Sequence, residues 1–132
     1  VAHFNGYDIS SEMLSAAKQY LASEASRVEF HKSSELVTMA DYSLTSGIFN
    51  VRFEEDETVW ETYIERTILN LNQFSNKGFA FNLLSSYVDF RAPDLHYADP
   101  ARYFSFCKRN CSRYVTLLHD YPLYEWTIIV KR

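Results

Sequence analysis

The sequence predicts an α/β protein with a doubly wound, mostly parallel sheet and an antiparallel β-hairpin at its C-terminal end. Short β-rich runs alternate along the chain with longer stretches whose apolar residues recur at helical spacing. The resulting order, β-α-β-β-α-β-α-β-β, favours an open, mostly parallel sheet covered on both faces. The last two β-rich runs, residues 112–119 and 124–130, are joined by Asp120-Tyr121-Pro122-Leu123, which is typical of a hairpin.

The first half of the chain supplies one helix and three strands. An extended run ends at Asp8, and Ser10 follows as a helix N-cap with Glu12 in the first turn. Residues 27–31 and 39–46 are the next two predicted strands. The apolar residues that share one face of the helix are Met13, Leu14, Ala17, Tyr20 and Leu21.

The second half supplies two further helices and three strands. An acidic run over residues 54–57 precedes a long helical pattern, which we expect to end at Asn-Lys-Gly, residues 76–78. Residues 78–84 then form a buried strand, and a loop covers residues 85–98. Asp-Pro at residues 99–100 predicts the start of a helix, as its N-cap and first helical residue.

Composition and charge limit the class of protein. The 132 residues are 47% hydrophobic and 17% aromatic, which suits one globular domain over residues 1–132. The net charge is −4 and no Lys/Arg block occurs, so we expect no nucleic-acid partner. No apolar run approaches the roughly 20 residues that span a bilayer, and no signal peptide opens the sequence, which favours a cytoplasmic protein without a membrane partner. Two cysteines and four scattered histidines predict no metal site.

Asp8 is the first candidate for a functional side chain, because it ends a predicted strand directly before a helix. In doubly wound sheets, ligands bind outside the carboxyl ends of the strands. A carboxylate at such a place can accept hydrogen bonds from both vicinal hydroxyls of a ribose. The alternative is that Asp8 does no more than cap the helix that follows it.

The residues around Asp8 fit a longer pattern, Gly-x-Asp-x-Ser-x-x-Met-hydrophobic-x-x-Ala. The matching residues are Gly6, Asp8, Ser10, Met13, Leu14 and Ala17. This pattern resembles the second strand and following helix of the class I S-adenosylmethionine-dependent methyltransferases, a Rossmann-like fold family. Residues 27–35 resemble the family's third strand and adenine-contacting turn, and residues 40–47 its fourth strand and exit. The last two β-rich runs are similar to its terminal hairpin, so the resemblance covers nearly the whole chain.

The resemblance implies S-adenosyl-L-methionine as the cofactor and assigns roles to particular residues. Asp8 would bind the ribose hydroxyls, and two apolar residues after it would form the wall beside the adenine. Ser34 stands in the adenine-contacting turn where the family often has Asp, and the neighbouring Glu35 could substitute. Three residues after the fourth strand would lie beside the methionine moiety and the transferred methyl group. The full implied set is Asp8, Ile9, Met13, Ser33, Ser34, Glu35, Ser46, Gly47 and Ile48.

One part of the family pattern does not occur in the sequence. The family's first strand ends in a loop of roughly Asp/Glu-x-Gly-x-Gly, because glycine lets the backbone approach the cofactor closely. The three glycines of this chain do not form such a loop, and Val1 falls just before the second strand. We therefore expect a domain truncated at its N-terminus. In the family's strand order, 3-2-1-4-5-7-6, the loss of strand 1 leaves unpaired edges on strands 2 and 4. These edges predict either a homo-oligomer or a rearranged sheet.

A small-molecule methyl acceptor is expected beside residues that follow the predicted strands. His119 could act as a general base for an acceptor hydroxyl, or it could simply end the hairpin. His96 lies in the loop after the fifth strand of the family, where loops often line the acceptor pocket, but a surface position is the expectation. The candidates for the acceptor pocket are Phe49, Asn50, Tyr87, Phe90 and His119.

The sequence thus favours methyl transfer from S-adenosylmethionine to a small molecule. The sulfonium methyl is already a strong electrophile, so the protein mainly has to align donor and acceptor, and no catalytic triad is needed. A non-catalytic methyltransferase-like remnant or interaction module is the alternative, because the glycine loop is missing. A nicotinamide dehydrogenase would share the ribose-binding acid, but the terminal hairpin and Asp-x-Ser-x-x-Met suit the methyltransferase pattern better.

Overall fold

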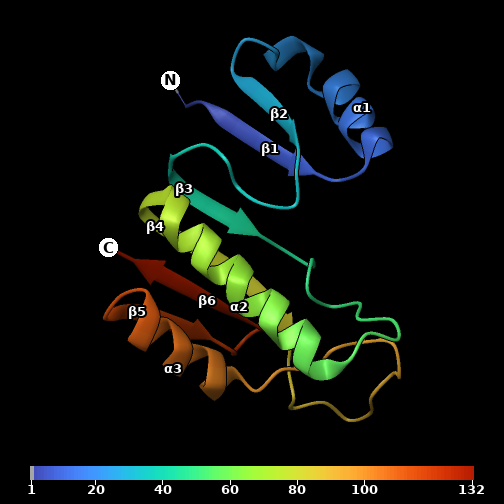
Figure 1. Cartoon of the computed structure of the whole chain (residues 1–132), viewed down its shortest axis with the longest axis vertical. Coiled ribbons are helices and arrows are strands. Elements are labelled where there is room, and N and C mark those ends of the chain that lie inside the picture. The colour runs from blue at the N-terminus through green and yellow to red at the C-terminus, as the bar shows by residue number, and fades with distance from the viewer. Residues whose placement is uncertain (1) are drawn as a thin grey trace. The chain divides into compact units, whose positions relative to one another are not determined.

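The computed structural model describes residues 2–132, which form two compact units (Figure 1). Unit 1 comprises Val1–Thr38, of which Val1 lies outside the described residues, and unit 2 comprises Met39–Arg132. Each unit is described by itself.

Unit 1 is a parallel strand pair with one helix. It contains β1 (Phe4–Asp8), α1 (Ser11–Tyr20), a short 3-10 helix η1 (Ala22–Glu24) and β2 (Val28–Lys32). The two strands pair in parallel from Phe4↔Val28 to Asp8↔Lys32. Ser10 caps α1 through its hydroxyl oxygen, which accepts a hydrogen bond from the Met13 N–H. The predicted strand, N-cap and helix are therefore confirmed in this unit.

Unit 2 contains a four-stranded mixed sheet and two helices. Its elements are β3 (Ala40–Thr45), α2 (Glu57–Phe74), β4 (Ser75–Leu84), α3 (Pro100–Asn110), β5 (Tyr114–Leu118) and β6 (Glu125–Lys131). The strand order is β3-β4-β6-β5, with β3 and β4 parallel and β6 antiparallel to both of its neighbours. This is the 4-5-7-6 part of the expected order, and the β1-β2 pair of unit 1 is its 2-3 part. The fold class and the terminal hairpin are confirmed.

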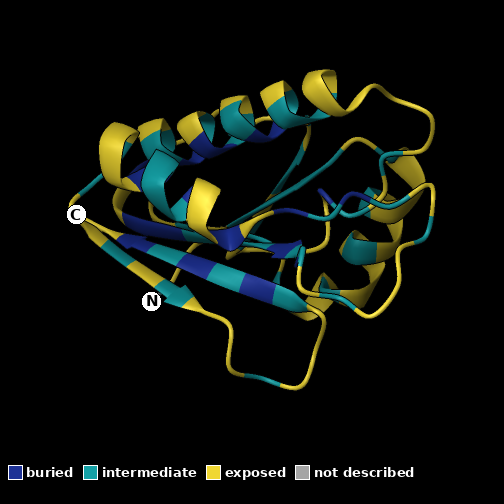
Figure 2. Cartoon of the chain, turned by 90° about the horizontal axis from the view of Figure 1, so that it is seen from below, coloured by how far each residue is buried: buried dark blue, intermediate teal, exposed yellow. Residues whose placement is uncertain are grey.

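Alternation along the strands of unit 2 produces its hydrophobic core. Trp126, Ile128 and Val130 of β6 are buried on the same sheet face as Phe79 and Phe81 of β4. Both helices cover this face, and Figure 2 shows their buried sides turned toward the sheet. The side chains that α2 contributes are Ile64, Ile68 and Leu71, and those of α3 are Tyr103 and Cys107.

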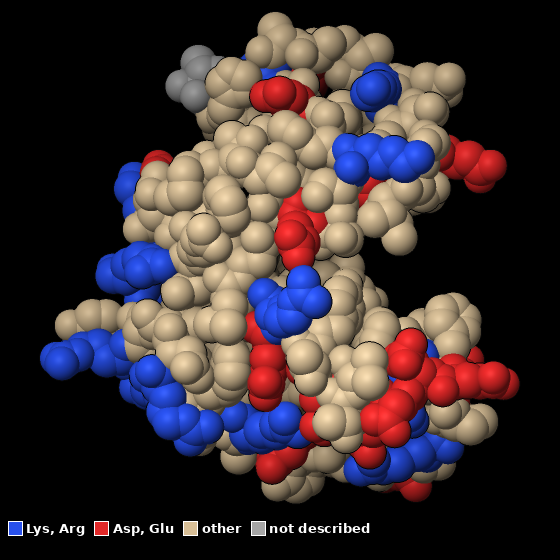
Figure 3. Space-filling view, in the orientation of Figure 1, with Lys and Arg blue, Asp and Glu red and all other residues tan. Residues whose placement is uncertain are grey.

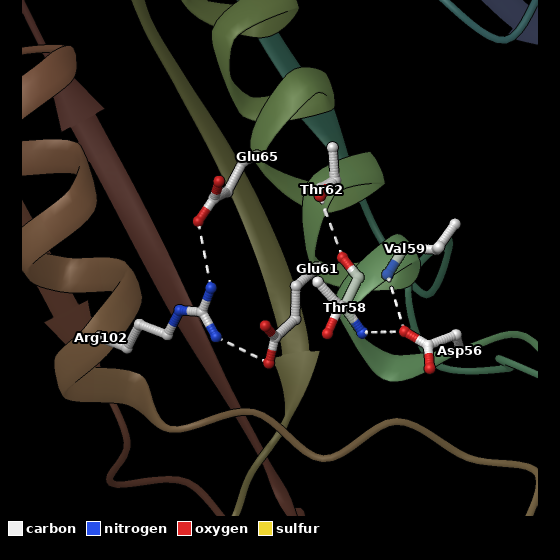
Figure 4. A network of polar contacts seen from close by, with 7 residues as sticks. All are labelled: Asp56, Thr58, Val59, Glu61, Thr62, Glu65 and Arg102. Atoms are coloured by element: carbon white, nitrogen blue, oxygen red, sulfur yellow. Dashed lines mark hydrogen bonds and ion pairs between the residues drawn. The ribbon is translucent and has the colours of Figure 1, made fainter.

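Ion pairs also connect the two helices. The Arg102 guanidinium of α3 pairs with Glu61 at 2.7 Å and with Glu65 at 3.2 Å, both on α2 (Figure 4). Figure 4 also shows the N-cap of α2, where one Asp56 carboxylate oxygen accepts hydrogen bonds from the backbone N–H groups of Thr58 and Val59. The Glu61 and Glu65 carboxylates raise the pKa of Arg102 above its ordinary value, chiefly because Glu61 accepts a hydrogen bond from the guanidinium.

The end of α2 differs from the sequence prediction. We expected residues 76–78 to end this helix, but α2 ends at Phe74, and Ser75 is already extended. Gly78 lies inside β4, opposite Lys131 of β6. The glycine is therefore required by the close approach of a neighbouring strand and does not cap the helix.

The buried hydrophobic residues all belong to unit 2. They run from Phe49 to Val130, and no described residue of unit 1 is fully buried. The opposite face of the unit 2 sheet also carries exposed apolar side chains, among them Tyr42, Leu44 and Tyr114. No helix of residues 2–132 is long and apolar enough to cross a membrane.

Candidate functional site

Asp8 lies at the carboxyl end of β1, as the sequence predicted, and it joins three local elements. One carboxylate oxygen accepts a hydrogen bond from the Ser10 N–H at 2.8 Å, at the entry to α1. Its backbone carbonyl accepts one from the Ser33 N–H at 3.1 Å, just after β2. Within residues 2–132 no further group is bonded to the side chain, so the carboxylate keeps acceptor capacity for a ligand.

The turn after β2 is therefore placed beside Asp8. The Ser33 hydroxyl donates to the Glu35 carbonyl at 2.7 Å and accepts from the Glu35 N–H at 3.1 Å, which fixes the turn locally. Ile9 is 68% exposed and Met13 59% exposed, although both are large apolar side chains. In unit 1 the turn that contains Ser33 and Glu35 therefore lies beside Asp8, and Ile9 and Met13 follow Asp8 along the chain at the entry to α1.

A cavity in unit 1 lies apart from these residues. It measures about 320 Å³ and is lined mainly by apolar side chains, including Phe4, Leu21, Val28 and Phe30. None of the nine implied cofactor residues lines it. On the other face of the strand pair, Tyr7 stacks on His31 with ring centroids 4.7 Å apart, a contact that sequence reasoning missed.

In unit 2 the residues after β3 form a tight turn. Gly47 has a φ of +76°, a conformation that favours glycine, and a Cβ there would meet no close neighbour. Its N–H donates to the Asn82 side-chain oxygen at 2.9 Å, and the Asn82 amide nitrogen donates to the Ser46 hydroxyl, also at 2.9 Å. Ile48, next in the turn, is exposed. Sequence reasoning missed Asn82, because its partners lie on a segment far away along the chain.

The backbone carbonyls of the next two residues of this turn accept hydrogen bonds from residues outside the turn. Phe49 is fully buried, and its carbonyl accepts a hydrogen bond from the Trp60 indole of α2 at 2.9 Å. The prediction that Phe49 lines an acceptor pocket was therefore wrong, because its ring packs in the core against Tyr63 and Phe81. The Asn50 carbonyl accepts from the His96 N–H at 2.9 Å.

The prediction of a surface position for His96 was also wrong. A bridge between Val51 and Leu95 pairs the turn after β3 with the loop after β4, and His96 is left only 2% exposed. Its Nε2 atom has no hydrogen-bond partner within residues 2–132, and the same holds for the Asn50 side-chain oxygen. Burial lowers the pKa of His96, so its imidazole is neutral near pH 7.

Two of the predicted acceptor residues meet at the carboxyl end of the sheet. The rings of Tyr87 and His119 lie 5.8 Å apart, and Tyr87 is 72% exposed. Phe90 is also exposed, but no hydrogen bond or ring contact in residues 2–132 joins it, or Asn50, to this pair. Nearby in sequence, the Tyr124 hydroxyl donates to an Asp89 carboxylate oxygen at 2.6 Å, and this bond raises the pKa of Tyr124.

Charged side chains are unevenly spread over the drawn face of unit 2. In Figure 3, acidic side chains gather on the drawn face near the start of α2, which follows the acidic run at residues 54–57. Basic side chains gather near the end of α3, whose last turn carries Lys108 and Arg109. The part of the chain that the structure describes holds no group of three or more His, Cys, Asp or Glu residues that could bind a metal.

Comparison with known proteins places the fold and the family. No family model matches the sequence. The chain is 45% identical over 131 residues to a Mycobacterium tuberculosis protein named "Putative methyltransferase Rv1506c", covering 98% of this chain and 78% of the relative.

Solved structures with low sequence identity share the fold. The magnesium protoporphyrin IX methyltransferase of Synechocystis PCC 6803, solved with bound SAH, has a TM-score of 0.71 and 12% identity. That match covers 99% of this chain and 64% of the other, so the chain spans less than two thirds of that neighbour. An O-methyltransferase family protein of Burkholderia thailandensis has a TM-score of 0.63 and 10% identity, with 98% and 42% covered. From its sequence relative and its strand order, the chain belongs to the methyltransferases and has the class I methyltransferase fold.

Proposed function

We propose that this chain transfers a methyl group from S-adenosylmethionine to a small-molecule acceptor. Membership of the methyltransferases supports the reaction class. Two structures of the Synechocystis fold neighbour, one with bound SAH and one with bound SAM, support the choice of cofactor. The observation that carries the proposal is the Asp8 carboxylate at the end of β1, which keeps acceptor capacity after it has bonded the entry of α1.

The side chains present fit this cofactor in chemical type. Asp8 would accept hydrogen bonds from the ribose hydroxyls. The exposed apolar surface of Ile9 and Met13 would cover the adenine, and the Ser33–Glu35 turn, which includes Ser34, would contact its edge. Ser46, Gly47 and Ile48 would contact the methionine moiety. In this proposal residues 1–132 act as one methyltransferase domain.

When bound, S-adenosylmethionine supplies a methyl group on a positively charged sulfur. The task of this chain's residues is then to align an acceptor atom and to exclude competing water. Tyr87 and His119 present an exposed ring pair for the acceptor. The His119 imidazole could take a proton from an acceptor hydroxyl or amine, and Asn50 and Phe90 complete the proposed acceptor residues.

The charge of unit 2 supports a small acceptor that is not a polyanion. The acidic run before α2 would repel the phosphates of a nucleic acid. We also propose self-association, because β1 pairs only with β2 and β3 only with β4 among the described strands.

A second candidate is a methyltransferase-like module that does not bind the cofactor. It is favoured by the three glycines of the chain, Gly6, Gly47 and Gly78, none of which forms a Gly-x-Gly pair. Backbone approach to a cofactor commonly depends on such a pair.

Calorimetric titration of S-adenosylhomocysteine into the chain separates the two candidates. We expect saturable binding by the wild type and at least tenfold weaker binding by Asp8→Asn. This variant keeps an oxygen for the Ser10 N–H but loses the charge, so it distinguishes ribose binding from helix capping. Ser10→Ala is the control, because it removes the cap bond to Met13 and leaves Asp8 intact. A folded wild type without binding would overturn the proposal and favour the second candidate. If Asp8→Asn bound S-adenosylhomocysteine as tightly as the wild type, the role of Asp8 would be limited to capping α1.

A further inference from the structure

The turn at residues 46–50, which follows β3, is held by hydrogen bonds from three separate parts of unit 2. Asn82 of β4 bonds its first two residues, the Trp60 indole of α2 bonds the Phe49 carbonyl, and the His96 N–H bonds the Asn50 carbonyl. Each of these bonds joins residues at least 11 positions apart. The turn is therefore fixed by its surroundings more than by its own sequence.

The Asn82 bonds have a single chemical interpretation. The Gly47 N–H can only donate, so the Asn82 atom that faces it at 2.9 Å is the carbonyl oxygen. The amide nitrogen must then face the Ser46 hydroxyl oxygen, also at 2.9 Å, and donate to it. One side chain thus fixes the backbone of one residue and the hydroxyl oxygen of its neighbour.

Packing in the hydrophobic core does not explain why residue 82 is an asparagine. It pairs with Thr127 of β6 on the sheet face opposite the helices, and it is only partly buried. Both hydrogen bonds that its side chain makes within residues 2–132 go to the turn.

The conformation of Gly47 makes such a clamp useful. At a φ of +76° the turn uses a backbone region that glycine enters freely, but glycine is free to leave it as well. A hydrogen bond from Gly47 to a neighbouring strand removes that freedom and orients the turn before any ligand arrives.

We infer that Asn82 is a positioning residue that holds Ser46 and Gly47 in the geometry required to bind the methionine end of the cofactor. This inference rests on the proposed function, since it takes Ser46–Ile48 as part of the cofactor site. Asn82 acts through these residues and need not touch the cofactor.

The test combines a measurement on the free protein with one of binding. In the free chain, amide exchange of Gly47 followed by NMR should accelerate at least fivefold in Asn82→Ala and stay near wild type in Asn82→Asp, which keeps an oxygen acceptor. In calorimetry, S-adenosylhomocysteine should bind Asn82→Ala about tenfold more weakly. Asn76→Ala is the matched control, an exposed asparagine on the same strand, and should change neither quantity.

The outcomes separate this inference from the function on which it rests. Faster Gly47 exchange together with weaker binding supports it. If the wild type and Asn82→Ala bound S-adenosylhomocysteine equally well, the inference would be overturned and the proposed function would stand. Unchanged Gly47 amide exchange in Asn82→Ala would have the same meaning. A folded wild type that binds no S-adenosylhomocysteine would overturn the proposed function and this inference with it.

Discussion

Gly78 of β4 lies against the main chain of Val130 in β6: a Cβ built on Gly78 would come 2.5 Å from the Val130 carbonyl oxygen. That oxygen belongs to the backbone and cannot rotate away as the end of a flexible side chain could. The close approach occurs where the central strand pair of unit 2 begins, with Gly78 opposite Lys131.

Gly78→Ala should therefore destabilise the protein by about 1–3 kcal/mol, the usual range for overpacking a well-packed site. Urea unfolding followed by circular dichroism measures the change. Asn76→Ala on the same strand is the control, since this side chain is exposed and should shift the unfolding midpoint little. A Gly78→Ala protein as stable as wild type would show that the strands can separate to admit a methyl group.

Acid should weaken the folded state through His96. Burial is the largest cause of its lowered pKa, Arg52 and Arg102 add to the shift, and Glu57 and Glu61 of α2 oppose it. The unfolded chain therefore binds the proton more readily than the folded chain. In the unfolded chain the pKa of His96 is about 6.5, and in the folded chain it is lower. The stability contributed by neutral His96 is therefore fully present above pH 6.5 and is lost as the pH falls through the folded pKa.

Urea unfolding at pH 7.5 and at pH 5.0 tests this expectation. His96→Gln should lose less unfolding free energy between the two pH values than the wild type does. His119→Gln, which changes an exposed histidine, is the control and should follow the wild type. Equal losses in all three proteins would mean that His96 does not contribute to acid sensitivity.

The edge of β3 that does not pair with β4 should promote self-association. This strand pairs only with β4 among the described strands, and its Leu44 is 81% exposed. Exposed apolar strand edges are ready to pair with another chain, and a lysine on such an edge opposes pairing. We expect light scattering to give a mass that rises with protein concentration for the wild type and less so for Leu44→Lys. Leu123→Lys, at an exposed position in the hairpin loop, is the control. A monomer at every concentration would contradict the proposed homo-oligomer.

Features fixed by neighbours in the sequence could be predicted well. Ser10 and Asp99 cap helices by accepting hydrogen bonds from N–H groups three and two residues further on, and such bonds leave a local pattern. The strand that ends at Asp8 and the terminal hairpin were predictable for the same reason.

Features that depend on distant strands could not be predicted. Glycine serves equally as a helix end and at a close approach of two strands, and only β6, some 50 residues later, decides between these uses at Gly78. His96 is buried by its pairing with Asn50, and Asn82 gains its role from Ser46 and Gly47. No local pattern marks any of these three relationships.

The confinement of the buried core to unit 2 has a consequence for how this sequence can change over evolutionary time. In unit 2 a substitution must respect the volume of a closely packed interior. In residues 2–38 no side chain is fully buried, so side-chain volume is constrained at fewer positions, such as Gly6 against the Phe30 ring. Natural variation there should tolerate wider changes in side-chain size than in unit 2, and should be restricted chiefly at the positions proposed to bind the cofactor. Asp8 should therefore persist among variable neighbours, whereas Trp126 should persist together with the side chains packed around it.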